Sequence, residues 1–181
     1  MEVLGSMIKD IYKKHKKIII IAHLICILVI CMFCYTHAQP TKDERVFIFV
    51  TGQKYMKEDL KIALEELGED NGILDVSSFG YDEYDSSFSQ AFATKGFYSS
   101  DLFIMSKTVF DTYKTTNTFR TLPSEIVSLS DNWVVDDSGN IIAIAINEEF
   151  FIAIGNKSAK SNDLMQEFIN YIILNGDDLF E

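Results

Sequence analysis

Cysteine and histidine are absent from most of this chain. The three residues of each type all lie before residue 40: Cys26, Cys31, Cys34, His15, His23 and His37. Beyond that point the sequence excludes disulfides, thiolate chemistry, histidine-based metal sites and a Ser-His triad. We predict no catalytic residues, no metal and no cofactor there. An enzyme that relies on carboxylate and hydroxyl groups alone is the least favoured function.

Basic stripes and stretches rich in proline or glycine are also missing. Beyond residue 17 the chain has 11 Lys and Arg against 25 Asp and Glu, a net charge of −14. This charge argues against nucleic-acid binding, because it would repel the phosphates. Since no change of composition marks a further boundary, residues 46–181 are expected to form one domain with its own core.

Charged residues are absent from Ile18 to Tyr35, directly after a cluster formed by Lys13, Lys14, Lys16 and Lys17. A helix over this run would cover roughly 27 Å, close to the ~30 Å hydrocarbon core of a bilayer. Positive flanks tend to stay in the cytoplasm. The sequence therefore predicts a cytoplasmic tail at 1–17, a transmembrane anchor at 18–38, a linker at 39–45 and an extracytoplasmic domain at 46–181.

Two processed forms compete with a retained anchor in the cell membrane. Thr36-His37-Ala38 has the small-x-Ala pattern of a signal-peptidase site, and cleavage after Ala38 would give a secreted protein. The apolar run exceeds the usual signal-peptide core of about 7 to 15 residues, so retention is favoured. A lipoprotein is least favoured, because Phe33 replaces the small residue expected before Cys34.

Hydrophobic patterning beyond the linker alternates between strand and helix. Residues 46–50 and 102–105 are continuous apolar runs typical of buried strands, and residues 73–79 form another extended run. Between them, apolar residues recur at helical spacing from Met56 to Leu67 and again around Phe88. The order βαβαβ predicts parallel strands joined by helical crossovers.

The second half changes character. Trp133 to Val135 and Ile141 to Ile146 flank the turn residues 136–140, which predicts a β-hairpin. Residues 150–154 add one more strand, and an amphipathic helix from Leu164 to Ile173 closes the chain. The expected fold is a transmembrane helix followed by one three-layer α/β domain, with a mostly parallel sheet and a hairpin near the C-terminal half.

Three segments resemble extracellular solute-binding proteins of the type 2 periplasmic-binding-like fold. Ser100-Asp-Leu-Phe-Ile-Met-Ser106 is similar to the family's "ADLF" strand, which ends at the ligand cleft. Asp137 to Ile146 is similar to its "dGkiyaiP" approach to the hinge, with Ile146 in place of proline, and Ile154 to Leu174 is similar to its returning strand and helix. The length fits one lobe only, with the second lobe missing between Ile146 and Phe150. The resemblance implies a binding module, but not closure of two lobes around a ligand.

A ligand site in a parallel sheet is expected at the carboxyl ends of the strands. The candidate residues there are Thr51, Gly52, Gln53, Gly80, Tyr81 and Ser106. The glycines would permit close backbone approach, and Tyr81 and Gln53 would supply a stacking face and an amide. The favoured alternative is that both glycines merely permit tight turns and that Tyr81 packs at a rim.

Two functions of different class follow from these observations. The first is an extracytoplasmic binding or sensing module for an unknown small solute, including a role as an accessory to a transporter. The second is an interaction subunit without a small ligand, bound to a membrane protein partner. The acidic segment from Tyr81 to Ser86 fits either solvated charge or a cation or basic partner.

Overall fold

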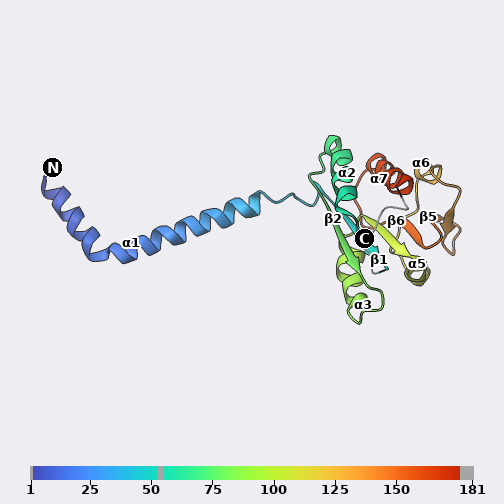
Figure 1. Ribbon diagram of the computed structural model, residues 1–181, viewed down its shortest axis with the longest axis horizontal. Coiled ribbons are helices and arrows are strands. Elements are labelled where there is room, and N and C mark those ends of the chain that lie inside the picture. Colours follow the sequence, from blue (N-terminus) through green and yellow to red (C-terminus); the bar gives the residue numbers. More distant parts are fainter. Residues whose placement is uncertain (1, 53–54, 176–181) are drawn as a thin grey trace. The chain divides into compact units, whose positions relative to one another are not determined.

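The computed structural model describes residues 2–52 and 55–175 (Figure 1). The chain divides into two compact units, Met1–Pro40 and Thr41–Glu181. The first unit consists of helix α1, Glu2–His37, and the second is a mixed α/β domain built on one sheet. Each unit is described by itself.

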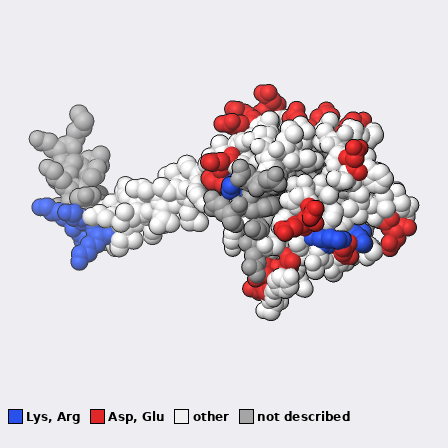
Figure 2. All heavy atoms as spheres, turned by 45° about the vertical axis from the view of Figure 1, so that its right-hand side comes forward, with Lys and Arg blue, Asp and Glu red and all other residues white. Residues whose placement is uncertain are grey.

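Helix α1 contains a segment, Lys13–Thr36, of 24 residues that is long and apolar enough to cross a membrane by length and composition. None of this segment is buried within the structure, and Leu28 is 62% exposed. In Figure 2 the lysines gather at one end of an uncharged stretch of helix. Such a helix could be a membrane anchor or a signal sequence, since both share this length and composition.

The sheet of the second unit has six strands in the order β2-β1-β3-β6-β5-β4. In chain order the strands are β1 Arg45–Thr51, β2 Asp75–Tyr81, β3 Leu102–Ser106, β4 Trp133–Val135, β5 Ile141–Ala145 and β6 Phe150–Ile154. Strand β1 pairs in parallel with both β2 and β3. The pairs β3 with β6, β6 with β5 and β5 with β4 are antiparallel.

The expectation of a mostly parallel sheet is therefore wrong for half of it. Strands β5 and β6 are joined by residues 146–149 only, and such a short connection permits only antiparallel pairing. Strand β6 then lies beside β3 and runs antiparallel to it. The sequence shows each of these strands but not which neighbour each one pairs with.

Helices and single turns lie between the strands, and one helix, α7, follows the last strand. They are α2 Glu58–Gly68, η1 Glu69–Asn71, α3 Phe88–Ala91, the π-helical turn η2 Phe92–Gly96, α4 Phe97–Ser99, α5 Lys107–Tyr113, α6 Ser124–Val127 and α7 Asn162–Leu174. Ser161 caps the amino end of α7, because its hydroxyl accepts a hydrogen bond from the amide of Leu164. Gly72, with a φ of 75°, ends η1 and leads into β2.

Alternate residues of the central strands belong to two hydrophobic clusters. Ile48 and Ile104 pack in a cluster with side chains of α2 and α7, among them Leu64 and Phe168. Phe49, like Phe103, belongs to the other cluster, which holds the aromatic residues of α3, η2 and α5. Since successive side chains of a strand point to opposite faces, both faces of the central sheet are buried. Full burial of one such side chain contributes about 1.5–3 kcal/mol.

Candidate functional site

The carboxyl ends of β1, β2 and β3 meet at one edge of the sheet. A groove of about 480 Å³ lies there. Its lining comes from the segments that follow these strands and from the turn before β6: Gly52, Glu83, Tyr84, Ser106, Lys107, Thr108, Glu148, Glu149 and Phe150. Three of these segments follow parallel strands, and the fourth reaches the same edge because β6 runs in the opposite direction.

Ser106 connects three of the segments around the groove. Its amide donates a hydrogen bond of 2.7 Å to the hydroxyl of Thr51, which is fully buried at the end of β1. Its own hydroxyl donates to Oε1 of Glu83 over 3.0 Å. The same hydroxyl accepts from the amide of Val109 and so caps α5. One side chain thus fixes the loop after β2 relative to β3 and α5.

Gly52 forms a part of the groove where glycine is favoured. Its φ of 89° lies in the left-handed region, and a Cβ atom there would lie 3.1 Å from the ring of Phe150. The backbone conformation therefore favours glycine, and any side chain there would also require the Phe150 ring to shift. The ring of Phe150 stands beside Gly52 as an apolar wall.

Negative charge dominates the lining of the groove. Glu83, Glu148 and Glu149 contribute carboxylates, whereas Lys107 is the one basic residue among the described lining residues. Nζ of Lys107 is engaged by Asp111 at 2.8 Å. Hydrogen bonds from Lys107 and then Lys114 hold the pKa of Asp111 below its usual value.

Oε2 of Glu83 is buried and has no hydrogen-bond partner among the described residues. A buried acceptor without a donor costs about 1–3 kcal/mol, more for a charged group. The arrangement therefore favours a ligand group that carries a positive charge and donates hydrogen bonds.

The structure brings together some of the predicted site residues and separates others. Gly52 and Ser106 line the groove, and Thr51 lies buried beneath Ser106. Gly80 and Tyr81 do not line it, because β2 extends beyond the predicted end at residue 79 and both residues pair with β1. The ring of Tyr81 instead stacks on Phe49, with centroids 4.9 Å apart. Gln53 lies outside the described residues.

Sequence reasoning missed Glu83, Lys107 and the turn before β6 as site residues. Glu83 belongs to the acidic segment that was interpreted mainly as solvated charge, and Glu148 and Glu149 give no spacing signal of their own. The missing information was the antiparallel β6, which brings the turn residues to this edge. Within residues 2–52 and 55–175, no group of three His, Cys, Asp or Glu is placed to hold a metal ion.

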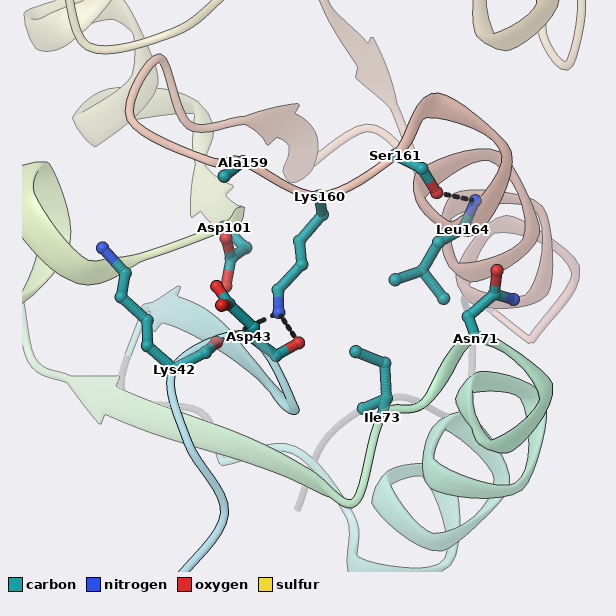
Figure 3. Close-up of a pocket in the computed structure, with 9 residues that line it drawn as sticks. All are labelled: Lys42, Asp43, Asn71, Ile73, Asp101, Ala159, Lys160, Ser161 and Leu164. Carbon is teal, nitrogen blue, oxygen red and sulfur yellow. Dashed lines mark hydrogen bonds between the residues drawn. The ribbon is translucent and has the colours of Figure 1, made fainter.

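A second cavity, of about 380 Å³, lies at the amino ends of the parallel strands (Figure 3). Lys160 crosses it and donates hydrogen bonds to the carbonyl oxygens of Lys42, at 3.1 Å, and Asp43, at 2.6 Å. Burial lowers the pKa of Lys160, and the charges of Asp101 and Asp43 partly offset that effect.

Asp101, 4% exposed, connects its own segment with β1 and with residues 155–158 at this end of the sheet. Its carboxylate accepts hydrogen bonds from the amide of Phe47 at 3.1 Å and from the hydroxyl of Ser158 at 2.7 Å. Its backbone donates to Phe47 and accepts from Gly155. Its charge also acts on Arg120, whose pKa is lowered chiefly by burial.

Neither a protein-family model nor a curated protein sequence matches this chain significantly.

Proposed function

We propose that the protein is a membrane-anchored binding or sensing module whose extracytoplasmic domain holds a small solute in the groove at the strand ends. The observation that carries this proposal is the groove itself. Four segments of the chain converge there around the bonded pair of Ser106 and Glu83. Ligands of open α/β sheets bind at this edge, outside the carboxyl ends of parallel strands.

The anchor and its orientation rest on α1. Its apolar segment is of membrane-spanning length, and Lys13, Lys14, Lys16 and Lys17 lie at its amino end. This distribution favours a cytoplasmic amino terminus and a second unit outside the cytoplasm. Retention of the helix is proposed over cleavage after Ala38, because the apolar run is longer than a usual signal-peptide core.

A relationship to one lobe of the solute-binding proteins is part of the same proposal. The lobe would be a three-layer α/β domain with a hairpin at β4 and β5. The two clusters on opposite sides of the central strands and the antiparallel pairing of Trp133 with Ile144 support this description. Since one lobe cannot enclose its ligand, we expect modest affinity or a transporter component that completes the site.

Thermal unfolding of the full chain in detergent micelles tests the binding function. Suitable probes are putrescine and arginine, which carry cationic groups, and succinate, which does not. A bound solute stabilises the fold by RT ln(1 + [L]/Kd), or about 2.7 kcal/mol at a concentration of 100 Kd. We expect stabilisation by the cationic probes only, lost in Glu83→Gln and kept in Glu66→Gln on the exposed face of α2. Absence of any shift with all three probes, or an unchanged shift in Glu83→Gln, would contradict the proposal.

One observation favours the alternative of an interaction subunit. Trp133 and Val135 are 48% and 42% exposed on β4, one of the two edge strands of the sheet. Exposed aromatic and β-branched side chains beside unpaired backbone groups are features of a protein contact. Under this alternative, Trp133→Ser releases a membrane protein that otherwise co-purifies with the chain, and no solute changes the melting temperature.

A further inference from the structure

The domain begins with a closed turn formed by residues 41–44. The amide and the hydroxyl of Thr41 each donate a hydrogen bond of 2.8 Å to Oε2 of Glu44. The amide of Glu44 donates back to the carbonyl oxygen of Thr41 over 3.2 Å. These bonds from Thr41, the backbone one first, hold the pKa of Glu44 below its usual value. The carbonyl oxygen of Glu44 accepts from the amide of Leu74, just before β2.

Lys160 holds this turn from a segment that is distant in the sequence. Its ammonium group reaches the carbonyl oxygens of Lys42 and Asp43, which are 118 and 117 residues away along the chain (Figure 3). Two carbonyl oxygens converging on one ammonium group form strong, charge-assisted hydrogen bonds.

The backbone around Lys160 is itself fixed, so the contact does not depend on a mobile loop. Ser158 donates its hydroxyl to the buried carboxylate of Asp101 and also accepts from the amide of Lys160. On the other side, Ser161 caps α7. The Lys160 side chain therefore extends from a segment secured at both ends.

The charges around Lys160 decide what its removal should do. Asp101 and Asp43 face it as negative charges, Lys42 faces it as a positive one, and burial disfavours its charged form. Replacing a partly buried ion by an apolar side chain of similar length is often close to neutral for global stability. Removal of the Lys160 ammonium group should therefore weaken the 41–44 turn and leave the stability of the core nearly unchanged.

We infer that Lys160 is a clasp that fastens residues 42–43 to the domain and so sets the length of free chain next to α1. Helix α1 ends at His37. With the clasp closed, the free chain is residues 38–40, which span at most about 10 Å when extended. With the clasp open and the turn bonds of Thr41 broken, the free chain extends through Asp43 and spans about 20 Å, because Glu44 stays bonded to Leu74. A single side chain thereby sets how much of the chain between residues 38 and 44 is free.

Hydrogen exchange of the full chain in detergent micelles, followed by mass spectrometry, tests the fastening. In Lys160→Met we expect amide exchange in the peptide 40–46 to become about tenfold faster or more. This is the change in local opening expected when ordinary hydrogen bonds are lost. Exchange in β1 and β3 should stay as in the natural chain. The control is Lys157→Met, which removes an exposed lysine of the same segment and should change neither. Unchanged exchange of 40–46 in Lys160→Met would overturn the inference.

A measurement on the unaltered chain covers the case in which Lys160→Met does not fold. Brief acetylation with an amine-reactive ester should modify Lys160 several-fold more slowly than the exposed Lys157, because the Lys160 amine is engaged by two carbonyl groups. Equal rates of modification at the two lysines would overturn the inference as well.

The effect of Lys160 on the distance between the domain and the lipid surface rests on the proposed membrane anchor. It is measured separately. Trp133, the single tryptophan of the chain, can donate energy to dansyl lipids in vesicles that contain the full-length protein. We expect lower transfer in Lys160→Met than in Lys157→Met. Faster exchange with unchanged transfer would refute the control of reach. Absence of transfer even in the natural chain would contradict the anchor and leave the fastening result in place.

Discussion

The hydroxyl of Ser106 donates a hydrogen bond of 3.0 Å to Oε1 of Glu83, across the edge of the sheet where the parallel strands end. Through this bond the end of β3 fixes the loop that follows β2, although the two strands lie on opposite sides of β1. The contact gives the groove a defined carboxylate, and it explains why a serine is needed at the end of β3. Replacement of either residue should therefore affect both folding and binding.

Ser106→Ala should destabilise the domain by about 1–2 kcal/mol. The change removes the cap of α5 and the donor to Glu83, and loss of a cap alone costs about 1 kcal/mol. Chemical denaturation of the full chain in detergent measures the loss. Ser106→Thr keeps the hydroxyl and should cost less. Equal losses for the two variants would mean that the hydroxyl is not responsible.

Gly155→Ala should destabilise the domain by about 1–3 kcal/mol, the range for overpacked sites. A Cβ atom at Gly155 would overlap the carbonyl oxygen of Ser100 and lie 3.1 Å from the ring of Phe103. Since the overlap involves backbone, no side-chain rotation relieves it. The control is Gly72→Asn, because Gly72 has open space around it and asparagine tolerates its positive φ. Denaturation midpoints that fall equally for both would contradict this account of Gly155.

Asp101→Ala should be among the most damaging single changes, at about 3 kcal/mol or more. It leaves the amide of Phe47 and the hydroxyl of Ser158 without their acceptor, and it removes the negative charge facing Lys160. Asp70→Ala, at an exposed residue of η1, is the matched control and should change stability little. Thermal unfolding compares them, and a small effect of Asp101→Ala would show that water replaces its contacts.

Asp136 should make stability depend on pH in the acid range. Hydrogen bonds from Asn140, by side chain and then backbone, hold the pKa of this carboxyl below its usual value. A carboxyl with a lowered folded-state pKa contributes stability above its unfolded pKa of about 3.9, and this contribution is lost as the pH falls through the lower folded value. The free energy of unfolding of Asp136→Asn is measured in steps of about one pH unit between pH 6 and pH 2. It should depend less on acid pH than that of the natural chain. Identical pH profiles would contradict this.

The sequence predicts those parts of the fold whose signal is local. The apolar run 46–50 corresponds to β1, and the spacing from Leu164 to Ile173 corresponds to α7, because burial of one face dictates both patterns. Strand partners are a long-range property. The sequence therefore did not predict that β6 lies antiparallel to β3, nor that Glu148 and Glu149 reach the groove. Gly80 and Tyr81 do not line the groove for a related reason, since pairing with β1 extends β2 beyond its apolar residues.

Protease treatment of intact cells tests the account most directly, because both the anchor and the outside binding site depend on one topology. With an epitope tag at the C-terminus, we expect protease added to intact cells to remove the tag and digest the domain, while a tag placed before Met1 survives until lysis. Digestion of the domain only after lysis would contradict the account.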